Sequence, residues 1–169
     1  MSVVFAVLLC CSLIGIDQII KLLVINNLKP VQYVDVLDGV LRLRYVENTG
    51  AIFGSFAAHT AFLTVFSVIL LGFTIFLLVK NKDKNKFVSL CLLLMISGGI
   101  GNIIDRIRLH YVVDYIEPLF VDFAVFNFAD CLITVGAFAL IIYLIIDLIK
   151  DTKKSKNTVS EGLQDDSEK

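Results

Sequence analysis

Four long apolar segments constrain the fold of this chain more than any other feature. They cover roughly residues 3–25, 60–79, 87–106 and 127–149, and the second, "TAFLTVFSVILLGFTIFLLV", contains no charged residue. An α-helix needs about 20 apolar residues to cross the hydrocarbon core of a bilayer. The sequence therefore predicts a membrane α-helical protein with four transmembrane helices.

Composition favours the same class. Hydrophobic residues make up 57% of the 169 residues and charged residues 18%, more apolar surface than a water-soluble domain could cover. The net charge is −1, so no basic field favours nucleic acid as a partner. The four cysteines lie in or beside apolar runs without the spacing of a zinc site or a disulfide framework, so we interpret them as small buried side chains.

The first apolar segment could be confused with a cleaved signal peptide. It lacks a basic region before the apolar run and a small-residue cleavage site. The stretch "VLLCCS" also lacks the small residues usual before a lipoprotein cysteine. We therefore expect this segment to be a retained span.

Lysines between and after the segments predict the orientation. The loop "KNKDKNK" (80–86) contains four lysines, and four more follow the last span. Because cytoplasmic loops are enriched in Lys and Arg, both termini should be cytoplasmic, with 26–59 and 107–126 outside. We expect residues 1–150 to form one membrane domain and 151–169 a disordered cytoplasmic tail.

The outer segment 26–59 has a strand pattern. "VQYVDVLDGVLRLRYVEN" places alternating apolar residues on both sides of Asp38-Gly39, a favoured tight-turn pair. This predicts a small β-ribbon, or cradle, lying at the membrane surface.

Two acids stand at the outer end of the last two spans. Asp114 follows the third span, and Asp130 lies in the first turn of the fourth. Two adjacent carboxylates can share one proton, so that the charged member activates water and the protonated member polarises a carbonyl. The chain has no H-E-x-x-H or G-x-S-x-G motif and only two histidines, so carboxylates are the catalysts available to a hydrolase.

Structural roles for the same acids stay open at this point. Asn127 and Asp130 have the spacing of a helix capping box, and Asp114 could be solvated. Asp105 could pair with Arg106 or with lipid headgroups.

Other polar and small residues gather near the same membrane level. Asp17 and Lys21 form either an i,i+4 ion pair or part of a site, since ionisable groups in a membrane are functional candidates. The cluster Gly98, Gly99 and Gly101 favours close helix packing over phosphate binding. Further polar candidates are Asn48, Asn102, Asp105, Arg106 and Asn127.

Functions without peptide hydrolysis also fit intramembrane acids. A small carrier or proton-coupled subunit is one alternative, although no internal repeat is visible. A non-catalytic assembly factor is another. The G-x-G-D motif of presenilin-like proteases is absent, since "GIGN" occupies 99–102.

Five ordered blocks resemble the bacterial lipoprotein signal peptidase family, also called signal peptidase II: "DQIIK" (17–21), "ENTGAIFG" (47–54), "GGIGNIIDRI" (98–107), "VVDYI" (112–116) and "FNFADCLITVG" (126–136). The resemblance implies an aspartyl endopeptidase that removes signal peptides from prolipoproteins, cutting before a diacylglyceryl-modified cysteine. It implies that Asp114 and Asp130 are catalytic, without metal or cofactor. Supporting or substrate-binding residues are then Asp17, Asn48, Gly50, Asn102, Asp105, Arg106, Asn127 and Ala129.

The resemblance also implies an outer cradle, a short outer helix near 50–58, and a location in the bacterial cytoplasmic membrane with the site near its outer surface. The partners would be lipidated prolipoprotein signal peptides and membrane lipids, and we expect a monomer. Two departures concern the loops: His110 stands where the family often has glycine, and the loop between the two aspartates is short.

Overall fold

The structure, a computed structural model, describes residues 2–50, 56–81 and 85–165, with backbone alone for 56–60, 151 and 154–165. Four helices of this part of the chain are long and apolar enough to cross a membrane, which confirms the predicted architecture. The helices are α1 (Val3–Leu23), α2 (Phe56–Lys80), α3 (Lys86–Leu109) and α4 (Phe128–Asp165), and the π-helical turn η1 (Val24–Leu28) extends α1.

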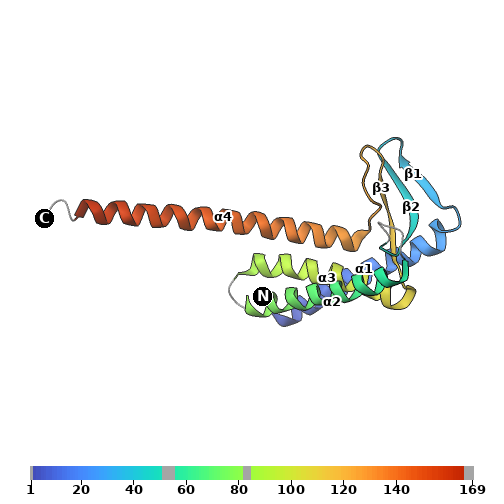
Figure 1. The fold of residues 1–169 in the computed structure, drawn as a ribbon, viewed down its shortest axis with the longest axis horizontal. Helices are drawn as coiled ribbons and strands as arrows, with labels where there is room; N and C mark the ends of the chain where they lie inside the picture. The colour runs from blue at the N-terminus through green and yellow to red at the C-terminus, as the bar shows by residue number, and fades with distance from the viewer. Residues whose placement is uncertain (1, 51–55, 82–84, 166–169) are drawn as a thin grey trace.

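Helix α3 lies at the centre of the bundle, and the other three helices pack against it (Figure 1). Its apolar window is 56% buried, against 6% or less for the other three spans. Small residues allow this close approach: a Cβ on Gly98 would collide with the carbonyl oxygen of Ala129 on α4, and one on Gly101 would collide with the Asp17 side chain on α1. The predicted packing role of these two glycines is confirmed.

Three antiparallel strands form a small sheet in the order β1-β2-β3 at one end of the bundle (Figure 1). The predicted ribbon is present as β1 (Tyr33–Leu37) and β2 (Leu41–Asn48), and Gly39 adopts φ 68° in the turn. The third strand, β3 (Val112–Pro118), was not expected, because its pairing with β2 joins segments about 70 residues apart.

A small hydrophobic core fixes the sheet to the end of α1. It contains Val24, Leu28, Tyr45, Val113 and Tyr115, from η1, β2 and β3. Since side chains alternate along a strand, burying Val113 and Tyr115 on this side directs Asp114 to the opposite face of β3. The core therefore determines where Asp114 lies.

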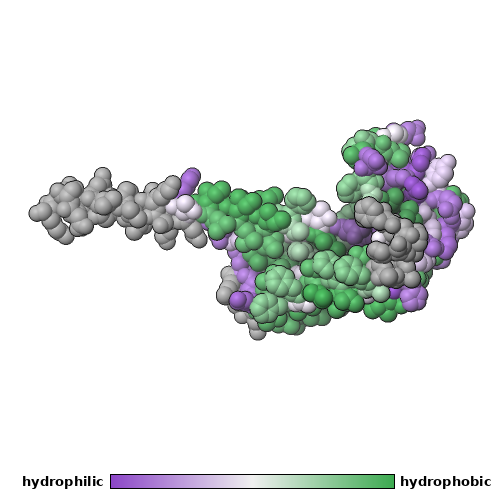
Figure 2. Space-filling view, viewed as in Figure 1, coloured by the Kyte–Doolittle hydropathy of each residue, from purple (hydrophilic) through white to green (hydrophobic). Residues whose placement is uncertain are grey.

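Apolar side chains cover the helical bundle, and polar side chains concentrate on the sheet (Figure 2). The exposed apolar residues of α1, α2 and α4 are those expected to face lipid. The four cysteines are free, with Cys91 buried and Cys11 exposed. The short outer helix expected near 50–58 falls mainly on 51–55, outside the described residues, and α2 begins at Phe56.

The C-terminal ends of α4 and α3 each show a feature that the sequence does not suggest. Helix α4 continues to Asp165, so the backbone of 151–165 is helical where the charged composition predicts a disordered tail; an established helix propagates at little cost per residue. Helix α3 ends at His110 with φ 66°, the left-handed conformation in which glycine is favoured. The position at which this chain departs from the family's frequent glycine is therefore a helix C-cap.

Candidate active site

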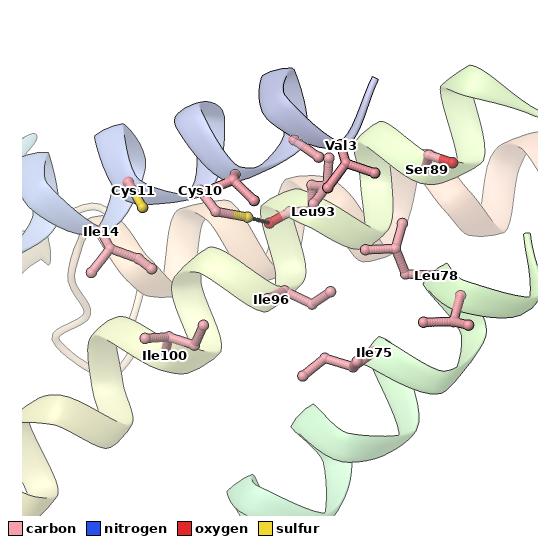
Figure 3. A pocket seen from close by; sticks show the side chains of 13 residues that line it. Val3, Cys10, Cys11, Ile14, Ile75, Leu78, Ser89, Leu93, Ile96 and Ile100 are labelled. Atoms are coloured by element: carbon pink, nitrogen blue, oxygen red, sulfur yellow. Dashed lines mark hydrogen bonds between the residues drawn. The ribbon is translucent and has the colours of Figure 1, made fainter. Parts of the chain in front are cut away.

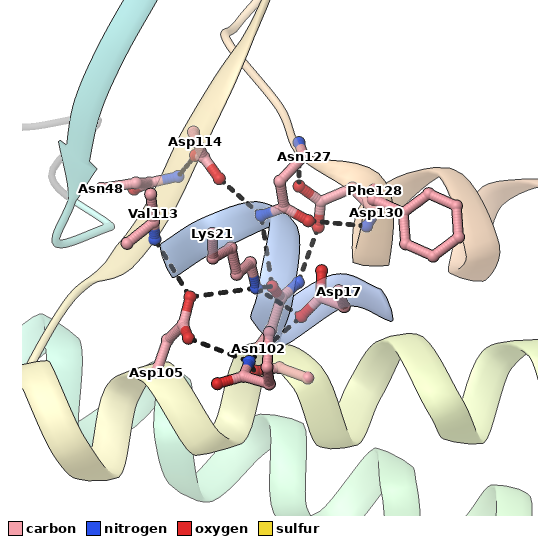
Figure 4. Close-up of polar contacts among 12 residues, drawn as sticks. Asp17, Lys21, Asn48, Asn102, Asp105, Val113, Asp114, Asn127, Phe128 and Asp130 are labelled. Atoms are coloured by element: carbon pink, nitrogen blue, oxygen red, sulfur yellow. Dashed lines mark hydrogen bonds and ion pairs between the residues drawn. The ribbon is translucent and has the colours of Figure 1, made fainter. Parts of the chain in front are cut away.

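Asp114 is almost completely buried on β3, opposite Val46 of β2. Its two carboxylate oxygens accept hydrogen bonds from different segments: Oδ2 from Asn48 Nδ2 at 2.7 Å and Oδ1 from Asn127 Nδ2 at 2.6 Å (Figure 4). Burial raises the pKa of Asp114 to about 6, and the negative charge of Asp130 acts in the same direction. Asp114 is therefore a carboxyl that holds a proton more readily than one in water.

Asp130 lies in the first turn of α4 and forms a reciprocal cap with Asn127. The Asn127 backbone N–H donates to Asp130 Oδ2 at 3.1 Å, and the Asp130 N–H donates to Asn127 Oδ1 at 3.0 Å. The other Asp130 oxygen, Oδ1, accepts from Asn102 Nδ2 at 2.8 Å. The capping interpretation of this pair is confirmed.

Asn127 connects the two acids. Its side-chain amide donates to Asp114, and its backbone N–H donates to Asp130 (Figure 4). The two carboxylates, 16 residues apart in sequence, thus converge on one fully buried asparagine. The cap and the convergence of the acids are the same structural feature, so the structural role of Asp130 does not compete with a chemical one.

A buried ionic cluster lies beside Asn102 and Asn127 and orients the Asn102 amide. Lys21 Nζ contacts Asp17 Oδ2 at 3.0 Å and Asp105 Oδ2 at 2.9 Å, and it donates to Asn102 Oδ1 at 2.9 Å. Asn102 Oδ1 also accepts from Asn127 Nδ2 at 3.2 Å. Because both donors occupy this oxygen, the Asn102 amide must present its Nδ2 to Asp130. The predicted Asp17–Lys21 pair is confirmed, and Asp105 pairs with Lys21.

An apolar groove of about 470 Å³ extends from Asp130 between α2, α3 and α4. Asn102, Arg106 and Asp130 lie at its polar end, and residues such as Leu77, Met95 and Leu140 line the remainder. The half-buried Arg106 interacts electrostatically with the negative charges of Asp130 and Asp114. Within the described ranges its side chain forms no ion pair or hydrogen bond, so its guanidinium donors remain available to a ligand.

The remaining expected residues also belong to this region. Gly50 adopts φ 79°, and its N–H donates to Asn48 Oδ1 at 2.8 Å, which turns the Asn48 amide nitrogen toward Asp114. Ala129 is fully buried against Gly98. The structure therefore brings together all ten residues expected at the site.

Two residues at the site were not expected from the sequence. Gln18 Nε2 donates to Asp17, to Asp105 and to the carbonyl of Gly101, and the Tyr115 hydroxyl accepts from the Phe128 N–H at 3.2 Å. Gln18 follows directly after Asp17 in "DQIIK", which was its only signal in the sequence. Tyr115 lies in "VVDYI", but no local pattern predicted its contact, because that contact depends on β3 lying beside the start of α4.

No group of three or more His, Cys, Asp or Glu side chains within 2–50, 56–81 and 85–165 could hold a metal ion. The chemistry that the described side chains offer is that of two buried carboxyls with amide and guanidinium donors around them. Such an arrangement can move a proton and stabilise a developing negative charge.

Comparison with known proteins agrees with this arrangement. The family model described as signal peptidase (SPase) II matches residues 9–146. A lipoprotein signal peptidase of Streptococcus thermophilus is 44% identical over 133 residues, covering 79% of this chain and 87% of that protein, and one of Streptococcus pyogenes is 40% identical over 132 residues, covering 78% and 87%. A solved structure of a bacterial membrane enzyme matches with a TM-score of 0.77 at 27% identity, covering 84% of this chain and 93% of that one.

The four spans, the three-stranded sheet and the buried acid pair define a multi-pass membrane hydrolase of the aspartic protease class. The chain belongs to the signal peptidase II family, whose members remove signal peptides from lipoprotein precursors.

Proposed function

We propose that Asp114 and Asp130 are the catalytic pair of an endopeptidase that cuts diacylglyceryl-modified prolipoproteins immediately before the lipidated cysteine. The observation that carries the proposal is the convergence of both carboxylates on Asn127, at 2.6 Å and 3.1 Å. Two carboxyls held at one hydrogen-bonded site can share a single proton.

One shared proton is sufficient for peptide hydrolysis by this pair. The ionised carboxyl takes a proton from water as the water oxygen attacks the carbonyl carbon, while the protonated carboxyl donates to the carbonyl oxygen. When the C–N bond breaks, the leaving nitrogen takes a proton from the pair. A hydroxyl of the tetrahedral intermediate returns a proton to the pair as the C=O bond re-forms, so one proton remains shared. The raised pKa of Asp114, about 6, means that this carboxyl takes up a proton more readily than a carboxyl in water.

Substrate recognition would use the groove between α2, α3 and α4. Its apolar wall, with Leu77 and Met95, suits the apolar part of a signal peptide that stays at membrane depth. A helix satisfies its own backbone groups, so the segment to be cut must unwind and needs new hydrogen-bond partners. The free donors of Arg106 would bind carbonyl oxygens released in this way.

The lysine distribution supports an outward-facing site. Lys80 ends α2, Lys86 begins α3, and the lysines of α4 follow Ile149; these three helix ends lie away from the sheet (Figure 1). Cytoplasmic lysines would then place both termini inside and the acids near the outer surface of the bacterial cytoplasmic membrane. Residues 1–150 would act as a single protease domain, in contact with membrane lipids and active as a monomer.

The test is cleavage of a lipidated precursor peptide by purified protein in detergent. Asp114→Asn and Asp130→Asn should each lower kcat by about 10³-fold or more, the range that general acid–base catalysis supplies. Asp122→Asn is the matched control, because Asp122 is an exposed aspartate in the loop between β3 and α4. Substantial cleavage by either site variant would refute the catalytic pair.

Two further measurements in the same assay address the substrate and the chemistry. An unlipidated precursor should be cut poorly, because the diacylglyceryl group supplies binding energy through its buried CH₂ groups. A chelator should leave the rate unchanged, whereas loss of activity in EDTA would replace the carboxyl mechanism with a metal-dependent one.

A further inference from the structure

A second apolar groove lies between α1, α2 and α3. It has a volume of about 600 Å³, within the usual range for ligand pockets. Helices α1 and α2 each pack against α3 but not closely against one another, which leaves this space between them. Figure 3 shows the side chains that line it, among them Cys10, Ile14, Leu78, Leu93, Ile96 and Ile100.

Helix α3 separates this groove from the acids. Leu93, Ile96 and Ile100 line it from one face of α3, as their spacing of three and four residues requires. Met95, Gly99 and Asn102 line the groove beside Asp130 from another face. A ligand in the α1–α2–α3 groove would therefore not reach the acid pair.

Every residue that lines the α1–α2–α3 groove belongs to one of the candidate spans Val3–Leu28, Ala61–Lys80 and Lys86–Leu109. In a bilayer its surroundings are hydrocarbon, and its lining is almost entirely apolar. The ligand that fits such a lining at that depth is an acyl chain.

Two exposed lysines lie near the end of the groove where α2 ends and α3 begins. Lys80 directly follows Val79, which lines the groove, and its Nζ lies 5.7 Å from the centroid of the Phe76 ring. Lys86 is one helical turn before Ser89, which also lines the groove. Two cations at this position attract an anionic headgroup. They repel the basic region that precedes the apolar run of a signal peptide, which disfavours a signal peptide as the occupant.

We propose that the α1–α2–α3 groove is a binding site for an anionic phospholipid, with an acyl chain against Cys10 and Ile96 and the phosphate at Lys80 and Lys86. Fluorescence quenching can test this, because the chain contains no tryptophan. Val7→Trp places a reporter at the groove, where Val7 is 54% exposed. Ile146→Trp is the control: it lies four residues from the end of the α4 span and does not line the groove.

The reporters are measured in phosphatidylcholine nanodiscs containing increasing amounts of brominated phosphatidylglycerol or brominated phosphatidylcholine. Half-quenching of Val7→Trp should need about fivefold less of the anionic lipid, the preference that one lysine near a headgroup supplies. Ile146→Trp should be quenched equally by both lipids. Val79→Trp, on α2, is a second groove reporter should the first variant fold poorly.

Lys80→Gln with Lys86→Gln should remove the preference, whereas Lys150→Gln, at the end of the α4 span, should leave it intact. Equal quenching of the groove reporters by both lipids would overturn the proposal. The same conclusion would follow if the preference survived loss of both lysines, or if Ile146→Trp showed it equally. None of these measurements depends on peptide cleavage.

Discussion

Asn127 and Asp130 bind one another in both directions, each donating its backbone N–H to the side chain of the other at 3.1 Å and 3.0 Å. The Asn127 amide also donates to Asp114 at 2.6 Å. Helix α4 therefore begins at the residue that joins the two acids. Any change that loosens the start of this helix also separates the proposed catalytic pair.

Replacing Asn127 tests whether this residue contributes to catalysis beyond its role as a helix cap. Asn127→Ala removes a helix cap, at about 1 kcal/mol, and also removes the donor to Asp114. The loss of cleavage, measured as kcat, should then be much larger than the cap loss alone explains. The loss of stability is measured as the thermal unfolding midpoint.

Asn85 provides a matched control for that substitution. It caps α3 by accepting from the N–H groups of Phe87 and Val88, and it hydrogen-bonds Tyr143 far from the acids. Asn85→Ala should lower stability by a similar amount while leaving kcat near the parent value. Equal loss of activity in the two variants would show that Asn127 acts only as a cap.

Stability should depend on pH through Asp114. Its pKa rises from 3.8 to about 6 on folding, so the folded protein holds the proton more tightly than the unfolded chain. The resulting stabilisation is complete below about pH 4 and is lost as the pH rises through about 6. Asp114→Asn, which cannot ionise, should therefore gain about 2 kcal/mol relative to the parent between pH 4 and pH 8.

Unfolding midpoints of parent and variant at the two pH values measure this gain. The absolute stability of Asp114→Asn is a poorer readout, because asparagine offers only one oxygen to the amides of Asn48 and Asn127. A constant difference between Asp114→Asn and the parent at the two pH values would mean that folding does not raise the pKa of Asp114.

Lys21→Met should be among the most destabilising single substitutions. It leaves Asp17 and Asp105 buried without their cation, which typically costs 3–5 kcal/mol. Lys29→Met breaks the exposed pair with Glu47, which water screens, and should cost far less stability. Chemical unfolding of both variants compares the two pairs directly, and similar costs would show that the Lys21 cluster adds no more stability than a surface pair.

Alanine substitution at two glycines should change stability in opposite directions. Gly98→Ala puts a Cβ against the carbonyl oxygen of Ala129, so α3 and α4 must separate and stability and cleavage should both fall. Gly72 in α2 has no neighbouring atom within 4 Å of an added Cβ, so Gly72→Ala should raise stability by up to about 1 kcal/mol. Thermal unfolding measures both, and a neutral Gly98→Ala would contradict the close packing of α3 on α4.

The sequence alone determined the four spans, the hairpin at Asp38-Gly39 and the cap formed by Asn127 and Asp130. Each depends on residues close together in the chain: a run of about 20 apolar residues, a turn pair, or a spacing of three. Hydrogen bonds within one segment and transfer from water to lipid do not require knowledge of distant neighbours, so local patterns sufficed.

Tertiary structure decided which polar groups meet. Strand β3 exists only through pairing with β2, and that pairing brings Asn48 to Asp114 across 66 residues. Lys21 reaches Asn102 across 81 residues because Gly101 lets α1 approach α3. A buried charge or amide must find a partner wherever packing places one, and no local pattern encodes that choice.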